Sequence, residues 1–470
     1  MKNNRVNIKE KKIYIAVIII FVVLSILIGC HHEPWADEAH SWLISRDTSL
    51  YSLFFKYLHT DGHPALWHII LKIFQIFEFN YKYFFIIPII FSSIGVTLFL
   101  FKSKFPIYIK ILFPFTYFIF YQYTIVARGY CLLFPILCCL AIIWDEKYKS
   151  CYWFTTLLVL LLSTEAYTYI FAGMLYLFYI INFFKNIKSI KNIKSNIICM
   201  IILFLMFIIT FLYVHPISTN TFITRKSLFL FSDSFVTPFY SNILVKLLIT
   251  LLLIFSFYFF CKKYKLYKEF FWIIVLLTPV YLFYIFFYTN VWHFGILFLL
   301  FIFLIWIFKL DNKRFIIVSL ITICSIQIYW TSRSAYYDYN NKYSVGLDVA
   351  NFIKKYDYKN LRIYGTSFGD SVVNPYFDFN IFCNWNKDIA FFYWNTNNKF
   401  YDENLDEDYL IKVSPDIIMS SKLYRIYDDD KLLKHYNKYE FNGYSYFEDN
   451  YYEDQSIIVY VLKEIDDKEI

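Results

Sequence analysis

Apolar runs recur through residues 1–330 and restrict the possible folds of this chain more than any other feature. Each run is about 15–20 residues long, close to the length that a helix needs to span the hydrocarbon core of a bilayer. Apolar residues make up 59% of the 470-residue chain, which excludes a soluble fold. The sequence predicts a polytopic α-helical membrane protein with about eleven spans, at 13–30, 83–101, 107–124, 129–144, 151–164, 166–184, 196–214, 241–260, 270–288, 294–308 and 315–330.

The segment 65–79 is ambiguous, because it is short and contains the polar side chains of His68, Lys72, Gln75 and Glu78. If it crosses the membrane, every later lysine-rich loop moves to the outer face. If it stays on the outer side, those loops are cytoplasmic, as the positive-inside rule requires. We favour the second topology. In either topology the basic amino terminus, with Lys2, Arg5 and Lys9, is predicted to be cytoplasmic, so the first span leads residues 31–64 to the outer face.

Charge divides the chain into two parts. Residues 1–330 carry 29 basic and 13 acidic side chains (+16), whereas residues 331–470 carry 16 basic and 24 acidic ones (−8). Membrane topology explains the positive part, so the charge is no evidence for nucleic acid as a partner. We predict a membrane domain over 1–330 and a small extracytoplasmic α/β domain over 331–470. The tail patterns predict helices at 344–356 and 428–439 and strands at 361–364, 389–393, 416–419 and 457–462.

An acidic pair, Asp37 and Glu38, directly follows the first apolar run. A carboxylate inside hydrocarbon costs about 2.5–3.5 kcal/mol even on a mild scale, so a wet cleft would suit this pair. On a helix, adjacent side chains diverge by about 100°, which favours two separate roles. One carboxylate would act as general base, and the other would position a nucleophile or bind a cation. The alternative is that both are helix-start carboxylates, which the helix dipole favours.

Histidines surround the acidic pair, at His31, His32 and His40. Asp37 and His40 stand three positions apart and would lie on one face of a helix, where they are candidate ligands of a divalent metal ion. The alternative is a set of polar interface residues. The stretch 37–58 is amphipathic and predicts helices along the membrane surface, with these side chains facing lipid: Leu43, Ile44, Leu50, Leu53, Phe54 and Tyr57.

Four further polar residues lie at span ends on the predicted outer face. His63 precedes Pro64 at a helix start, where a cation beside backbone N–H groups suits a phosphate; a turn histidine is the alternative. Arg128 is a natural bidentate partner for a phosphate, although it could instead snorkel to the interface. Glu165 would cap a helix or contact a substrate hydroxyl. His293 follows Trp292, which an interfacial aromatic belt would explain.

Taken in order, these motifs resemble the GT-C superfamily of membrane glycosyltransferases. The nearest groups are the protein O-mannosyltransferases and the lipid A aminoarabinose transferases. The resemblance covers about residues 13–310 and is carried by Pro34-Trp35-Ala36-Asp37-Glu38-Ala39, Asp61-Gly62-His63-Pro64-Ala65-Leu66-Trp67, Tyr121-Gln122-Tyr123-Thr124-Ile125-Val126-Ala127-Arg128-Gly129-Tyr130 and Trp292-His293-Phe294-Gly295.

The resemblance implies a sugar donor carried on polyprenyl phosphate and an acceptor, whether lipid, glycan or protein, at the outer face of a bacterial cytoplasmic membrane. It implies that Asp37 is the base or orients the acceptor, with Glu38 as its partner. His63 would contact the donor phosphate, Arg128 would line the same cleft, and Asp61 and His293 would bind substrate. Glu165 lies outside these motifs and is a candidate substrate-binding residue from its position alone. Trp292 departs from the family pattern, in which a basic residue often precedes the histidine. The alternatives are a transporter or lipid flippase and a non-catalytic envelope scaffold.

Overall fold

The computed structural model describes residues 7–61, 63–215, 230–236, 242–286, 290–385, 388–392, 405–422, 427–448 and 451–469. The chain forms two compact units, and each is built from three stretches that are separate in the sequence. The first consists of Met1–Leu27, Gly62–Leu66 and Ile86–Arg333. The second consists of Ile28–Asp61, Trp67–Phe85 and Ser334–Ile470. Residues 28–61 and 67–85 therefore pack with the tail, while the predicted boundary at 330 lies close to the last change of unit.

Among the described residues, eight helical segments are long and apolar enough to cross a membrane, so the chain has the character of a multi-pass membrane protein. Each coincides with one of the predicted spans. They are α1 (Ile8–Gly29), Tyr81–Lys102 with α6 (Ile86–Lys102), Gly129–Glu146 with α8 (Leu133–Ile143), α10 (Ala166–Lys185), α11 (Ile193–Val214), α12 (Ile243–Lys263), α13 (Tyr267–Phe286) and α15 (Arg314–Asn340).

The other three predicted spans are shorter or broken. The stretch 107–124 forms α7 (Ile107–Leu112), the 3-10 turn η3 (Phe113–Phe115) and the π-helix η4 (Tyr117–Ile125). Pro114 explains the first break, because it has no N–H to continue the α-helix. The helices α9 (Cys151–Leu162) and α14 (Val291–Ile307) have 12 and 17 residues.

The ambiguous segment forms the 11-residue helix α5 (Leu66–Ile76). At 1.5 Å per residue it covers about 16 Å, roughly half of a hydrocarbon core about 30 Å thick. This length falls short of a full crossing, as does that of the 12-residue α9, so the side of the membrane on which 65–79 lies stays a prediction.

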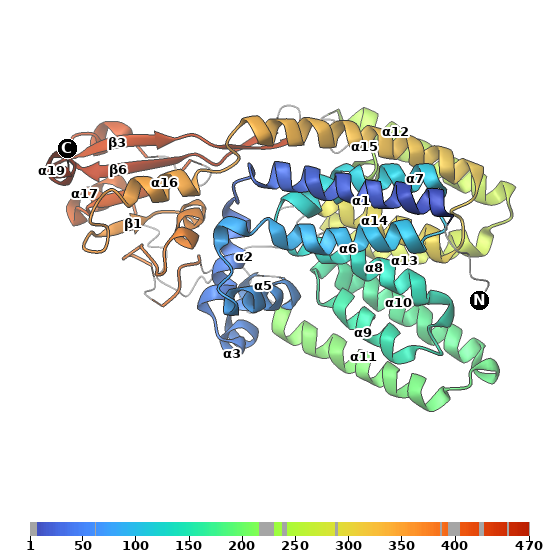
Figure 1. Ribbon diagram of the computed structural model, residues 1–470. Helices are drawn as coiled ribbons and strands as arrows, with labels where there is room; N and C mark the ends of the chain where they lie inside the picture. The colour runs from blue at the N-terminus through green and yellow to red at the C-terminus, as the bar shows by residue number, and fades with distance from the viewer. Residues whose placement is uncertain are drawn as a thin grey trace. The chain divides into compact units, whose positions relative to one another are not determined.

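Close helix packing in the first unit fixes the segments that carry the candidate residues. The helices α9, α10 and α11 run alongside one another (Figure 1). α14 packs on the π-helix η4 so closely that a Cβ at Gly295 would collide with Phe118 and Tyr123. This approach brings the start of α14 to the end of η4.

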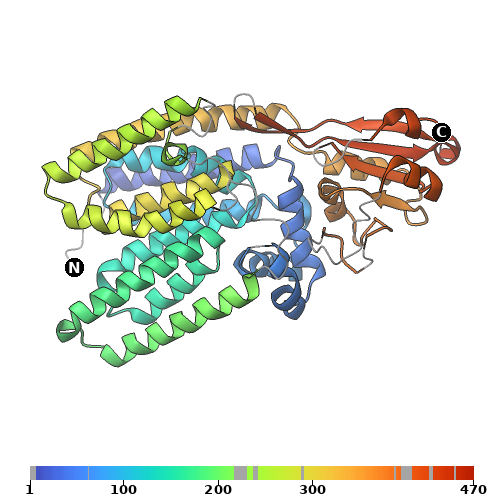
Figure 2. The same ribbon diagram turned by 180° about the vertical axis from the view of Figure 1, so that it is seen from behind.

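The second unit contains a four-stranded mixed sheet in the order β1-β2-β6-β3. β1 (Ile363–Gly365) is parallel to β2 (Ile417–Ser421), and β6 (Ile457–Leu462) lies antiparallel between β2 and β3 (Tyr436–Phe441). Figures 1 and 2 show β3 and β6 side by side. A hairpin of β4 (Tyr444–Glu448) and β5 (Tyr451–Asp454) follows β3. The remaining elements are α16 (Gly346–Ile353), η9 (Phe368–Tyr376), α17 (Glu407–Val413), α18 (Asp429–Leu432) and α19 (Lys463–Glu469).

The tail predictions are confirmed where one pattern dominates and wrong where two compete. The strand at 457–462 forms as β6 with the predicted bounds. The predicted helix at 428–439 ends at Leu432, and the tyrosine-rich sequence after it forms β3, because aromatic residues favour strands. The predicted strand at 389–393 does not form over 389–392. The backbone N–H of Ala390 there donates to a side chain, Asp47 Oδ2 at 2.7 Å, rather than to a neighbouring strand. Tyr393 lies outside the described residues.

The helices after α1 belong to the second unit, and the burial of apolar side chains in α2 and η1 corrects the prediction that these side chains face lipid. They are α2 (Ala36–Asp47), α3 (Leu50–Ser52), η1 (Leu53–Tyr57) and α4 (Leu58–Asp61). Of the side chains expected to face lipid, Leu43, Ile44, Leu53 and Tyr57 are buried, Phe54 is partly buried, and Leu50 is exposed. The amphipathic pattern was real, but its apolar face covers protein.

Candidate functional site

Glu38 lies in the first turn of α2. Trp35 is the N-cap residue, and its backbone N–H donates to Glu38 Oε2 at 3.1 Å, as in a capping box. The same oxygen lies 3.0 Å from His32 Nε2, and the Glu38 side chain has no exposed surface. Glu38 is therefore held within the protein, which fits the expected positioning partner better than the base.

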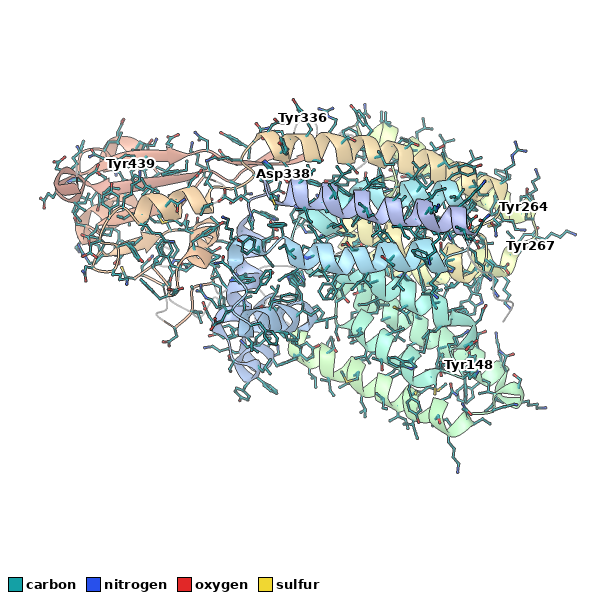
Figure 3. The ribbon with its side chains drawn as sticks, viewed as in Figure 1. Tyr148, Tyr264, Tyr267, Tyr336, Asp338 and Tyr439 are labelled. Atoms are coloured by element: carbon teal, nitrogen blue, oxygen red, sulfur yellow. The ribbon has the colours of Figure 1, made fainter. Side chains whose placement is uncertain are left out.

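His32 bridges Glu38 and a residue that sequence reasoning missed, Asp338. His32 Nδ1 lies 2.8 Å from Asp338 Oδ2, and both side chains are buried. Asp338 lies near the C-terminal end of α15 (Figure 3). Burial alone would lower the pKa of His32, but the charges of Asp338 and Glu38 outweigh it and raise that pKa to about 10. At neutral pH the imidazolium thus lies between two carboxylates.

Asp37 takes a different position from Glu38 on the same turn. Its side chain is only partly buried, and its carbonyl accepts a hydrogen bond from Ser41 Oγ at 3.0 Å. Because neighbouring helical residues diverge by about 100°, the two carboxylates point in different directions. The Asp37 carboxylate is therefore partly exposed, whereas that of Glu38 is buried.

His40 packs against two aromatic rings. Its ring is buried between those of Phe368 and Phe391, with centroid distances of 5.3 and 5.9 Å. Across the part of the chain that the structure describes, no group of three or more His, Cys, Asp or Glu side chains is placed to hold a metal ion. The Asp37–His40 pair lacks a further ligand of these types there, and we assign no step to a metal.

In the first unit, an irregular backbone presents Arg128 to two aromatic rings. Val126 and Arg128 are extended between η4 and the 3-10 helix η5 (Gly129–Leu132), which leads into α8. The guanidinium carbon lies 5.4 Å from the Tyr130 ring centroid and 5.8 Å from that of Trp292. Arg128 is 8% exposed and Trp292 is 5% exposed. Arg128 is thus held by cation–π contacts within the protein, and Trp292 packs against it rather than standing in an interfacial belt.

Glu165 joins His63 to the same unit. It is the N-cap residue of α10, and its Oε2 lies 2.7 Å from His63 Nδ1. The Glu165 side chain is nearly buried, while that of His63 is 30% exposed. The backbone N–H of Leu66, at the start of α5, donates to Ser163 O just before α10. Glu165 therefore serves both as the N-cap residue of α10 and as the carboxylate that bonds to the His63 imidazole.

His293 lies one turn into α14 among tyrosine rings. Its Nδ1 accepts from the Asn290 backbone N–H at 2.9 Å. Its ring centroid lies 4.6 Å from that of Tyr167 and 5.9 Å from that of Tyr130. The charges of Arg128 and His63 both act on His293. The first unit therefore brings together Arg128, His63, Glu165 and His293, which the sequence had placed on one membrane face.

The hydroxyl group of Tyr130 is a further feature that sequence reasoning missed. Tyr130 is fully buried, and its Oη has no hydrogen-bond partner among the described residues. Glu165 and Arg128 act on it electrostatically. The available signal was its place two residues after Arg128 in the Tyr121–Tyr130 motif. A buried hydroxyl without a partner calls for a water molecule or a ligand group.

The candidate residues thus form two groups, one in each unit. Asp37, Glu38 and His40 belong to the second, and Arg128, His63, Glu165 and His293 belong to the first. The side chain of Asp61 lies outside the described residues. No family model, curated protein or solved structure matches the chain.

The second unit should lose stability as pH rises. Burial raises the pKa of Glu33 and of Asp370 to about 7, and His32 is raised to about 10. In each case the native state favours the protonated form, so the stabilisation is greatest below the unfolded pKa and is lost as pH rises through the native one. Thermal unfolding of the protein in nanodiscs should therefore shift to lower temperature between pH 5 and pH 10.

Asp370→Asn is the informative variant in that titration. Asp370 Oδ2 accepts from the backbone N–H groups of Thr366 and Ser367, both at 2.7 Å, and an asparagine oxygen can accept the same two bonds. The variant should lose less stability than the wild type as pH rises through about 7. A melting temperature that is constant or rises from pH 5 to pH 10 would contradict the burial of these protonated groups.

Proposed function

We propose that the chain is a GT-C-like glycosyltransferase that moves a sugar from a polyprenyl-phosphate donor to an acceptor at the outer face of the cytoplasmic membrane. The observation that carries the proposal is the cluster of Arg128, His63, Glu165 and His293 within a unit of apolar helices. Buried ionisable groups among membrane helices are costly and are usually functional. A lipid-linked phosphate needs an apolar surface for its chain and cations for its head group.

The cluster suits a phosphate in two ways. Three helical segments begin at or near it, at Gly129, Ala166 and Val291, and helix starts carry partial positive charge and unpaired N–H groups. Arg128 can donate two parallel hydrogen bonds to phosphate oxygens. The Tyr130 hydroxyl can donate a further one. Glu165 would keep His63 oriented through its Nδ1.

The proposed reaction assigns one role to each group. Asp37, the partly exposed carboxylate, takes the proton from an acceptor hydroxyl or amine. The acceptor then attacks the anomeric carbon, the bond from that carbon to the phosphate oxygen breaks, and polyprenyl phosphate leaves with its electron pair. A single displacement inverts the configuration of the anomeric carbon. Arg128 and His63 stabilise the charge on the leaving phosphate. Glu38 fixes the start of α2 and hence the position of Asp37.

The proposal can be tested in cells by mass spectrometry of envelope glycans and lipids with and without the protein. We expect one sugar-bearing product to disappear when the gene is deleted, and its polyprenyl-phosphate donor to accumulate. Restoring the wild-type protein should return the product. If deletion changes neither the product spectrum nor the donor pool, the chain is not a transferase. A donor that accumulates on the cytoplasmic face alone would instead indicate a flippase.

A further inference from the structure

α2 shares an apolar core with the tail. Ala36 and Ala39 are fully buried in the same cluster as Val345, Val349 and Val372. These small alanines let η9 approach α2 closely, and the two elements are in extensive contact. The helix that carries Asp37 is thus part of the fold formed by residues 334–470.

Polar contacts join both ends of α2 to the tail. Before the helix, Glu33 Oε1 accepts from the backbone N–H of Leu347 at 2.6 Å. At its end, Arg46 Nη1 donates to Phe377 O at 2.8 Å, while Asp47 accepts from Ala390 N–H. Arg46 Nε also pairs with Asp47 Oδ1 at 2.6 Å. These contacts restrain both sliding and rotation of α2 relative to the tail.

The buried ion triad adds the strictest restraint. His32 lies between Glu38 at 3.0 Å and Asp338 at 2.8 Å, and all three side chains are almost completely buried. Removing one partner of a buried ion pair leaves an uncompensated charge, which strongly favours arrangements that keep the network complete. Because Glu38 also caps α2, the network fixes the first turn of the helix and, with it, the direction of the adjacent Asp37.

We propose that residues 334–470 hold α2 in a fixed position, a role that we call the mount of α2. We further propose that His32 and Asp338 are positioning residues for Asp37. Residues 334–470 then affect the reaction by fixing the position of α2, which carries Asp37. The chemical role of Asp37 rests on the proposed function, but the restraint on α2 does not. Neither His32 nor Asp338 needs to touch the substrate.

The test compares Asp338→Asn with a matched variant, Asp466→Asn, in the full-length protein in nanodiscs. Asp466 is also a buried carboxylate of the tail, bonded to Tyr356 and Tyr439, away from α2. In Asp338→Asn we expect faster amide hydrogen exchange over residues 36–47 and a kcat about 100-fold lower. The KM for the lipid-linked donor should stay the same. Asp466→Asn should leave exchange over α2 and kcat unchanged.

Two results would overturn the proposal. One is unchanged exchange over residues 36–47 in Asp338→Asn, and the other is an equal loss of kcat in Asp466→Asn, which would indicate general destabilisation of the tail. If Asp338→Asn does not fold, Arg46→Gln tests the other end of the mount, because it removes the bond to Phe377 and the ion pair with Asp47 while leaving the His32 network intact. It should raise exchange in the last turns of α2, and protection equal to that of the wild type would refute the mount.

The exchange measurement needs no turnover, so the two proposals fail separately. If the wild type transfers no sugar but Asp338→Asn still loosens α2, the proposed function fails and the mount stands. If the wild type transfers sugar and Asp338→Asn leaves α2 protected with full kcat, the mount fails and the function stands.

Discussion

Asp37→Asn should reduce sugar transfer by about 10²–10⁴-fold, the typical contribution of a general base, while the protein stays folded. The physical reason is that asparagine has nearly the same shape but cannot accept the acceptor's proton. Asp37 is partly exposed, whereas the buried Glu38 is bonded to His32. The measurement is the initial rate of product formation with a saturating polyprenyl-phosphate sugar, together with the melting temperature.

The control for this variant is Asp348→Asn. Asp348 is an acidic residue of α16 in the same unit that pairs with Lys342 at the surface. Surface ion pairs contribute about 0–1 kcal/mol, so this variant should keep the wild-type rate and stability. Wild-type turnover in Asp37→Asn would show that Asp37 is not the base and would return the pair to the role of helix-start carboxylates.

Arg128→Lys should lower kcat/KM for the lipid-linked donor by about 10²–10³-fold, the range for removing one transition-state donor. Lysine keeps the charge but loses the planar, bidentate hydrogen bonding and the stacking that hold Arg128 against Tyr130 and Trp292. The effect should appear in the transfer step and in binding of free polyprenyl phosphate. Steady-state kinetics and a binding titration would measure the two.

Arg333→Lys is the matched control, because Arg333 also lies over two aromatic rings, those of Tyr329 and Trp330, but on the exposed side of α15. It should leave both donor binding and turnover unchanged. Equal losses in Arg128→Lys and Arg333→Lys would show that the effect reflects general loss of arginine stacking. Normal donor kinetics in Arg128→Lys would remove the phosphate role of Arg128.

Hydrophobic length predicted the long helices because a run of about 20 apolar residues has few other stable conformations. The runs that became α1, α11 and α12 are examples, and they stand close to their predicted bounds. The stretch 107–124 has the same composition but contains Pro114 and a π-helix. Composition alone does not encode such breaks, nor the extended backbone at Val126 and Arg128 that follows η4.

The amphipathic stretch 37–58 shows a second limit of sequence reasoning. A helix with one apolar face must cover that face, but its pattern is the same whether lipid or protein covers it. Here the side chains of Leu43 and Ile44 are buried in the second unit. The packing of η9 on α2 brings in residues more than 300 positions away, and the local pattern of 37–58 does not show it.

The candidate site was predicted as far as local signals reach. Adjacent carboxylates after a span, an arginine between two spans and a histidine before a proline are visible in the sequence. The pairing of His32 with Asp338 was not, since 306 positions separate them and a lone aspartate near a helix end has no distinctive pattern. The bond between His63 and Glu165, 102 positions apart, was missed for the same reason.

The central claim is transfer from a lipid-linked phosphate with inversion, and one measurement tests it directly. The purified protein in nanodiscs would be incubated with an anomerically pure polyprenyl-phosphate sugar and an envelope extract as acceptor. Release of polyprenyl phosphate and the anomeric configuration of the product would be followed by mass spectrometry and NMR. We predict release by the wild type, a product of opposite configuration, and strongly reduced release by Asp37→Asn. A retained configuration, or equal release by wild type and variant, would contradict the account.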